Sequence, residues 1–268
     1  MKIILSPAKK MNNDEFCGIF GQPFFGNGNT LEISKPLYLN KTEEILSWLQ
    51  SQSNDELKKL WKCNDKIAQQ NFDRLEKMDL YNNLTPAVLA YEGIAFKYMS
   101  PAVFEDGHFE YVQEHLCILS AFYGALKAMD GVTPYRLEMQ AKASINGAKN
   151  LYDFWGMDLY NSVRDDSGII INLASKEYSK CIEKYLSSED RFITITFCEK
   201  AGDKLVTKGT YAKMARGDMV RFMAENNIEN PIEITKYNRM GYFFREDISS
   251  ENEFVFERAS GDGVFRHF

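Results

Sequence analysis

The chain has 268 residues, of which 44% are hydrophobic and 26% charged, which fits a globular protein and excludes collagen-like or disordered chains. Its 32 basic and 38 acidic residues give a net charge of −6. Nucleic-acid-binding proteins are usually basic, so this average argues against a DNA or RNA partner. The length, together with the absence of repeats and of Pro/Gly/Ser linkers, favours one α/β domain over residues 1–268.

Cysteine usage and the N-terminal residues predict a cytoplasmic protein. The five cysteines are scattered and form no C-x-x-C pair, which fits reduced, buried thiols better than a disulfide framework. The apolar run at residues 3–5 is too short for a signal peptide, and no stretch approaches the ~20 apolar residues of a membrane-spanning helix. We therefore expect no membrane partner.

The first half of the chain mixes one strand with several helix starts. Residues 2–5 predict a short strand, and residues 11–31, rich in Asn and Gly, predict a long loop. A helix is expected from Thr42 to about Gln50, and the S-x-x-E pattern at Ser53 is typical of a capping box. Thr85–Pro86 predicts a third helix start.

The second half alternates helices and strands. The apolar residues within 109–129 first recur at helical spacing and then lose that order, which predicts a helix with a break near Gly124. Residues 151–163 predict a helix, and the apolar run 168–173 predicts a strand buried on both faces, followed by a helix from Ser175 to about Leu186. Further strands are expected at residues 191–197, 204–207, 242–244 and 253–256.

Positive charge is concentrated in two short segments. Residues 200–221 hold six basic and two acidic residues, and residues 1–10 hold three lysines and no acid, so the rest of the chain carries −13. The net charge thus hides a separation of charge along the chain. An acidic body repels a polyanion and confines it to the basic segments.

Residues 211–224 predict an amphipathic helix. One face carries apolar residues, namely Ala212, Ala215, Met219, Phe222 and Met223. The opposite face carries Lys213, Arg216, Gly217 and Arg221, with Lys208 in a polar turn just upstream. Gly217 costs roughly 1 kcal/mol relative to Ala inside a helix, which suggests that something approaches the backbone there. A solvated basic face is the alternative to a binding face.

Residues from about 55 to 78 resemble the helix-hairpin-helix element of DNA-repair proteins. Four apolar or small positions fall in register, at Leu57, Leu60, Cys63 and Ala68. Lys62 and Asn64 replace the two hairpin glycines, while Lys62 and Lys66 supply positive charge and Asn64 tolerates a left-handed backbone. A plain helical hairpin remains the alternative.

Two polar clusters are the best candidates for a cleft. Arg136 and Glu138 stand in the first, where an internal ion pair is the simpler explanation. The second joins Asn172, at the end of a predicted strand, to Ser175 and Glu177 at a helix start, where open α/β sheets commonly bind ligands. The histidines, His108, His115 and His267, form no metal-ligand pattern, and no nucleotide-binding motif is present, so no metal or cofactor is expected.

Several motifs together resemble the YaaA family of peroxide stress proteins. They are Ser6–Lys9, Leu119–Gly124, Pro134–Met139, Tyr152–Gly156, Ile171–Ser175, Tyr211–Gly217 and Gly241–Phe244. The resemblance covers almost the whole chain. It implies a central mixed sheet surrounded by helices, the cantaloupe fold, with a basic cleft and a helix-hairpin-helix element. It also implies DNA binding within the bacterial response that limits iron-driven damage.

Carried over by position, the family's basic cleft would use Lys9, Arg136, Lys213 and Arg216, and its hairpin Lys62, Asn64 and Lys66. Lys10, Lys208 and Arg221 extend the set of candidate DNA contacts. No reaction is implied by the resemblance, so catalytic residues are not assigned and no obligate protein partner is expected. The leading hypothesis is a protein that binds duplex or distorted DNA through phosphates, with little sequence preference.

Two alternatives remain open. The first is an enzyme acting on a nucleic acid or nucleotide, with Glu138 or Glu177 as acid or base and Arg136 as an anion clamp. The second, weaker one is iron sequestration, for which the scattered Cys and His residues offer no obvious site.

Overall fold

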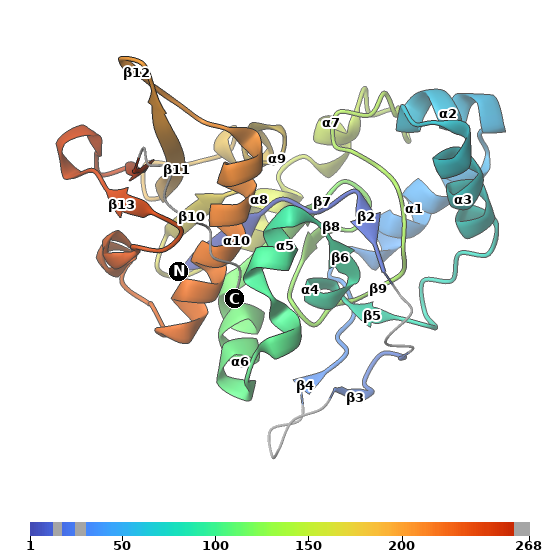
Figure 1. The fold of residues 1–268 in the computed structure, drawn as a ribbon. Helices are drawn as coiled ribbons and strands as arrows, with labels where there is room; N and C mark the ends of the chain where they lie inside the picture. Colours follow the sequence, from blue (N-terminus) through green and yellow to red (C-terminus); the bar gives the residue numbers. More distant parts are fainter. Residues whose placement is uncertain (13–17, 25–30, 260–268) are drawn as a thin grey trace.

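The computed structural model describes residues 1–12, 18–24 and 31–259, which are built around an eight-stranded mixed sheet (Figure 1). The strand order is β13-β14-β11-β10-β1-β7-β8, with β12 paired to β11. These strands are β1 (Lys2–Leu5), β7 (Leu116–Ser120), β8 (Gly124–Leu126), β10 (Ile169–Leu173), β11 (Arg191–Ala201), β12 (Lys204–Val206), β13 (Tyr242–Phe244) and β14 (Glu253–Arg258). The predicted α/β class with a central mixed sheet is confirmed.

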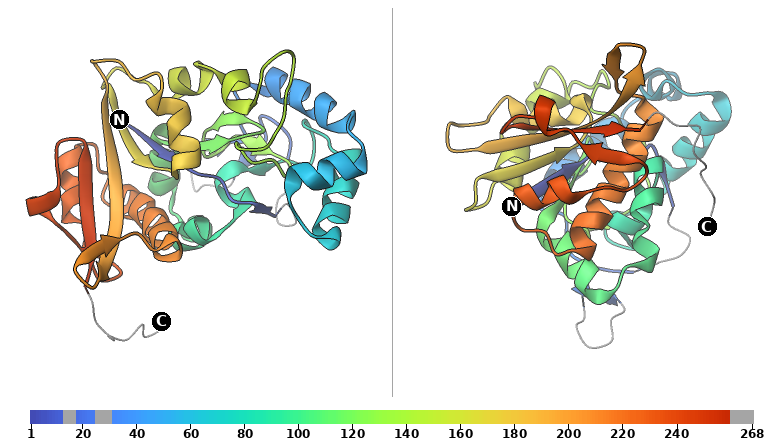
Figure 2. Two further views of the ribbon diagram at one scale, coloured as in Figure 1. Left: turned by 90° about the horizontal axis from the view of Figure 1, so that it is seen from above. Right: turned by 60° about the vertical axis from the view of Figure 1, so that its left-hand side comes forward.

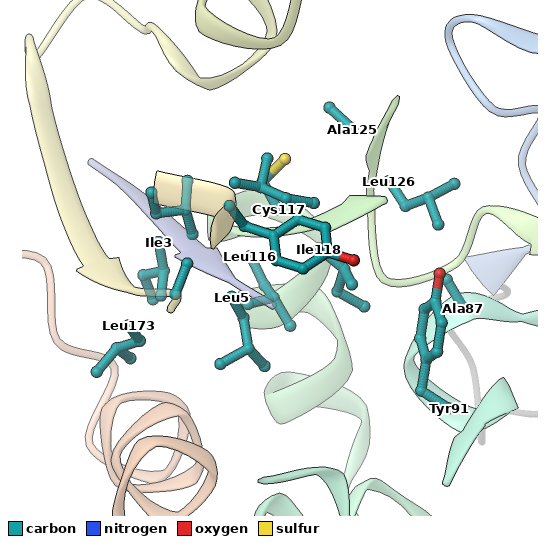
Figure 3. Close-up of a cluster of buried hydrophobic side chains, with 14 of the residues drawn as sticks. Ile3, Leu5, Ala87, Tyr91, Leu116, Cys117, Ile118, Ala125, Leu126 and Leu173 are labelled. Carbon is teal, nitrogen blue, oxygen red and sulfur yellow. The ribbon is translucent and has the colours of Figure 1, made fainter. Parts of the chain in front are cut away.

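The middle of the sheet is parallel and buried on both faces. β1 pairs in parallel with β10, Ile3 opposite Ile171, and with β7, Ile3 opposite Leu116. Figure 3 shows Ile3 and Leu5 of β1 among side chains of β7 and β10. Ile3, Ile4 and Leu5 are at most 1% exposed, which explains why this strand reads as a continuous apolar run.

Helices cover both faces of the sheet (Figures 1 and 2): α6 and α10 lie on one face, and α8 and α9 on the other. The helices are α1 (Leu39–Gln50), α2 (Asn54–Trp61), α3 (Asp65–Glu76), α4 (Ala87–Ala90), α5 (Ile94–Met99), α6 (Asp106–His115), α7 (Leu151–Trp155), α8 (Asp158–Val163), α9 (Lys176–Glu183) and α10 (Gly209–Glu225). Short strands pair outside the main sheet: β2 (Lys10–Met11), β3 (Pro23–Phe24), β4 (Leu31–Glu32), β5 (Thr85–Pro86), β6 (Tyr91–Glu92) and β9 (Gly131–Val132). No helix within the described residues is long and apolar enough to cross a membrane.

Four predicted elements differ from the structure. The helix expected over residues 151–163 is two helices, α7 and α8, because α7 ends before Gly156, whose φ is 54°. The helix expected across residues 109–129 ends at His115, and the apolar residues that follow form β7. The first long helix starts at Leu39, so Thr42 lies inside it, where its hydroxyl donates to the Tyr38 carbonyl. Thr85–Pro86 is the strand β5, and the helix begins one residue later. Parts of the predicted loop at residues 11–31, Cys17 and His267 lie outside the described residues.

α10 packs against α5 at Gly217 (Figure 1). A Cβ atom on Gly217 would lie 1.8 Å from the Ala95 carbonyl oxygen, so only glycine permits this approach. The expected close approach at Gly217 is therefore the backbone of α5. Consequently the face of α10 that carries Lys213 and Arg216 borders α5 and is not uniformly solvated.

α2 and α3 form a helical hairpin at one end of the molecule, away from β13 (Figures 1 and 2). The predicted capping box is present, because Ser53 and Glu56 exchange hydrogen bonds with each other's backbone amides. In the turn, Lys62 takes the left-handed conformation at φ 46°. Asn64 is extended and caps α3 by accepting from the Ile67 amide at 3.0 Å. The left-handed role expected of Asn64 therefore falls to Lys62.

Asp130 is a buried carboxylate, 3% exposed, that accepts hydrogen bonds from the Ser34 hydroxyl at 2.7 Å and from the Lys127 amide at 2.8 Å. Burial raises its pKa to about 6. An unperturbed aspartate has a pKa of about 3.9, so between pH 4 and 6 the folded protein holds the extra proton. The free energy of unfolding should therefore fall as the pH rises through this window.

Asp130→Asn is expected to remove this loss, so that its free energy of unfolding exceeds that of the parent by about 3 kcal/mol at pH 7 and differs little at pH 4. The asparagine amide keeps both contacts, because the Ser34 hydroxyl also accepts hydrogen bonds. Urea unfolding of both proteins from pH 4 to 7 measures the difference. A constant difference across this range would contradict the assignment.

Candidate anion-binding site

A cavity of about 370 Å³ opens where β1 and β10 end. These strands are neighbours, but β1 leads to β7 on one side and β10 leads to β11 on the other. This is the point where the order of strands reverses, and open α/β sheets bind ligands at such points, beyond the carboxyl ends of the strands. The end of β10 and the helix start at Ser175, which the sequence predicts to follow one another, therefore lie at the site.

The cavity brings together residues from five parts of the chain. Its lining includes the segment after β1, the segment from β6 into α5, the Tyr135–Glu138 segment, the start of α9 and one face of α10. The predicted site residues among them are Lys9, Lys10, Arg136, Glu138, Ser175, Glu177, Lys213 and Arg216. The four cations that the family resemblance assigns to the basic cleft thus line one concave surface.

Two lysines at the cavity are paired with carboxylates. Lys9 pairs with Glu138, and Lys10 pairs with Glu92. Both ammonium groups belong to strongly exposed side chains, at 68% and 77%. The Lys9 pair replaces the internal Arg136–Glu138 pair considered from the sequence. Because exposed ion pairs contribute little to stability, these lysines can exchange their carboxylates for another anion.

The two arginines have unused donors. Arg136 donates through Nη2 to the Trp61 carbonyl at 3.3 Å, which ties the cavity to the α2–α3 hairpin, but its buried Nε has no partner. Arg216 has no hydrogen bond or ion pair to any described residue, and its buried Nε is also without a partner. Burial lowers the pKa of Arg216. A buried cation without an anion is costly, so this geometry favours binding of an anion.

The polar wall opposite is fixed by hydrogen bonds between β1 and α9. The Ser175 amide donates to the Ser6 hydroxyl at 2.8 Å, and that hydroxyl donates to the Ser175 hydroxyl at 3.1 Å. Glu177 accepts from the Gln140 amide at 3.2 Å. Glu138 and Glu177 each have one partner and still line the cavity.

The other candidate residues lie outside the cavity. Asn172 is 4% exposed and spans β10 and β11 through its contact with the Thr194 hydroxyl. Lys208 pairs with Glu199, and Arg221 pairs with Glu225 at 2.6 Å. The exposed residues Lys62 and Asn64 lie in the turn between α2 and α3, and exposed Lys66 lies in the first turn of α3.

Sequence reasoning missed the α5 wall. Glu92 and the start of α5 line the cavity, including Ile94 and Phe96. In the sequence, Gly93, which lies between Glu92 and the start of α5, is a signal that points to this wall. Its Cβ would lie 2.6 Å from the Ala8 Cβ, so the approach of β6 to the segment after β1 requires glycine.

The described histidines have structural contacts. His108 Nδ1 accepts from the Glu105 amide at 3.2 Å at the start of α6, and buried His115 bonds the Met1 carbonyl at 2.8 Å. The described cysteines are free thiols, three of them buried. Among the described residues no group of His, Cys, Asp and Glu is arranged to hold a metal ion.

Fold and cavity define a mixed α/β protein with a cation-lined site at its strand-order reversal. The family model for peroxide stress protein YaaA matches residues 1–248. A UPF0246 protein of Agathobacter rectalis is 67% identical over 258 residues, covering 96% of this chain and 99% of the relative. One of Lachnoclostridium phytofermentans is 49% identical, covering 96% of each chain, and one of Desulfitobacterium hafniense is 48% identical, covering 98% of this chain and all of the relative. The chain belongs to the YaaA (UPF0246) family of peroxide stress proteins.

Proposed function

We propose that this protein binds DNA through the basic cavity and its rim, with little sequence preference, and so limits iron-driven damage to DNA during peroxide stress. The supporting observation is that five cationic side chains converge on one concave site: Lys9, Lys10, Arg136, Lys213 and Arg216. Phosphate oxygens are suitable partners for the unused donors of Arg136 and Arg216. The family's role in peroxide stress supports a DNA partner.

The α2–α3 hairpin extends this surface in the proposal. Asn64 already caps the Ile67 amide, and Asp65 in the first turn of α3 pairs with Lys58. Backbone amides are therefore poorly placed to receive a phosphate here, and Lys62 and Lys66 would act through their exposed ammonium groups. The hairpin contributes charge and not a phosphate-binding turn.

DNA affinity should fall steeply with salt, with a log–log slope of about −0.9 for each phosphate neutralised. Replacing the exposed lysines Lys9 and Lys213 of the cavity together by glutamine should reduce the size of the slope by about 1.8. Fluorescence anisotropy of a labelled duplex at several salt concentrations measures both values. Salt-independent binding, or no binding at low salt, would exclude this function.

A matched control is available on the β11–β12 hairpin. Lys200 and Lys204 are exposed and lie outside the cavity. Replacing both by glutamine removes the same number of charges, so the slope should stay at the parent value if the cavity binds the DNA. An equal change in the two double variants would mean that only overall charge matters.

An enzyme acting on a nucleic acid or nucleotide is the second candidate. It is favoured by Glu138 and Glu177, which line the same cavity as Arg136 and remain accessible there. Mass spectrometry of DNA recovered after incubation distinguishes chemical change from binding alone.

A further inference from the structure

The size of the basic cavity limits what enters it. Its volume of about 370 Å³ is near the lower end of the range for small-molecule sites. A double helix is far too large for it, so duplex DNA would contact only the rim. The deeper groups, above all the unpartnered Nε of Arg216, then stay out of reach of a paired strand.

The lining contains two chemically different kinds of group. Lys213 and Arg216 of α10 supply donors for an anion. Apolar side chains line the cavity as well, and those that keep exposed surface are Pro7, Ala8, Ile94 and Ala95. A ligand that matches both kinds of group carries a negative group and a flat, largely apolar group.

Three carboxylates complete the lining, from Glu92, Glu138 and Glu177. Carboxylates accept hydrogen bonds from the amino and imino groups of nucleobases. They repel a second phosphate, which disfavours ligands carrying several phosphates. The combination selects a single nucleotide unit over inorganic polyphosphate.

We infer that the cavity takes one nucleotide displaced from a DNA strand, with its phosphate at Lys213 and Arg216 and its base against the apolar wall. This inference rests on the proposed DNA binding and adds the unit that is recognised. Enzymes and readers that admit a single nucleotide gain selectivity for damaged or unpaired positions, because these are the least costly to displace. The protein would then distinguish lesions from intact duplex.

The test compares three labelled duplexes by anisotropy: fully paired, with one unpaired nucleotide, and with one abasic residue at the same bulge. The unpaired nucleotide should raise affinity roughly tenfold over both of the others, as expected for the contacts of one base. Equal affinity for all three would overturn the inference while leaving DNA binding intact. Binding of none would overturn the proposed function itself.

Two variants test whether the preference for the unpaired nucleotide arises in the cavity. Arg216→Gln should abolish the preference for the bulged duplex, because only the displaced unit enters the cavity far enough to meet the Arg216 guanidinium. Lys62→Gln with Lys66→Gln, on the outer hairpin, should weaken all three duplexes by the same factor and keep the preference. Loss of the preference in the hairpin variant alone would place recognition outside the cavity.

Competition with free ligands identifies the recognised chemistry. Deoxynucleoside monophosphates should displace the bulged duplex at concentrations at least tenfold lower than inorganic phosphate or the free nucleosides. If inorganic phosphate competes as well as the nucleotides, the cavity is an anion site without a place for the base, and the inference fails.

Discussion

Replacing Arg216 by methionine is expected to stabilise the free protein and to weaken its binding to DNA. The arginine is partly buried, with its Nε enclosed and no anion beside it, so removing its charge should raise the free energy of unfolding by about 1 kcal/mol and the melting temperature by about 3 °C. The same change removes the contact to the phosphate of the displaced nucleotide, which corresponds to a roughly tenfold loss of affinity for a duplex with one unpaired nucleotide. Thermal melts and anisotropy measure the two effects.

Lys213→Met is the matched control, since Lys213 stands one turn earlier on α10 and is exposed. Its loss should weaken DNA binding by a few-fold and leave the melting temperature unchanged, because an exposed ammonium carries no burial cost. The opposite pattern for Arg216→Met, a lower melting temperature with unchanged affinity, would assign that arginine to the structural framework.

Of the substitutions considered for this protein, Gly217→Ala should lower the free energy of unfolding the most. The new Cβ would lie 1.8 Å from the Ala95 carbonyl oxygen and 2.6 Å from its carbon, both backbone atoms of α5. Because neither helix can yield by rotating a side chain, α5 and α10 must separate. We expect a loss of about 4 kcal/mol and a fall in melting temperature of about 10 °C, measured by denaturation.

Gly209→Ala provides the control on the same helix. Nothing lies within 4 Å of its position for a Cβ, so alanine there should be neutral or slightly stabilising. If Gly217→Ala were equally neutral, the close packing of α5 on α10 would be wrong. The part of the cavity wall that α5 and α10 form would then have a different structure.

Elements whose apolar residues follow a single clear period could be predicted from the sequence. β10 and α10 each show a single pattern over enough residues, and both lie close to where they were expected. β7 was not predictable, because a strand buried on both faces has no alternation and its residues continue the spacing of α6. α5 has only six residues, too few for a helical period to appear.

Charge along the chain was a poor guide to charge at the site. Lys208 and Arg221 belong to the basic segment but pair with Glu199 and Glu225, so counting residues in a window overstated the free positive charge. Glu92 balances Lys10 from a distant segment. Pairing depends on tertiary contacts, which local composition does not record. The motifs shared with the family located the cavity residues better than the charge count did.

The central place of β1 also governs the order of folding during synthesis. Residues 2–5 leave the ribosome before their partners in the sheet, which are residues 116–118 and 170–173. At typical rates of translation the second partner follows on the order of ten seconds later. One edge of this apolar strand therefore stays unpaired for that time, and the shortness of the strand limits the chance of wrong pairing. The cavity at the ends of β1 and β10 cannot form before this pairing, and its α10 wall, with Lys213 and Arg216, is synthesised later still.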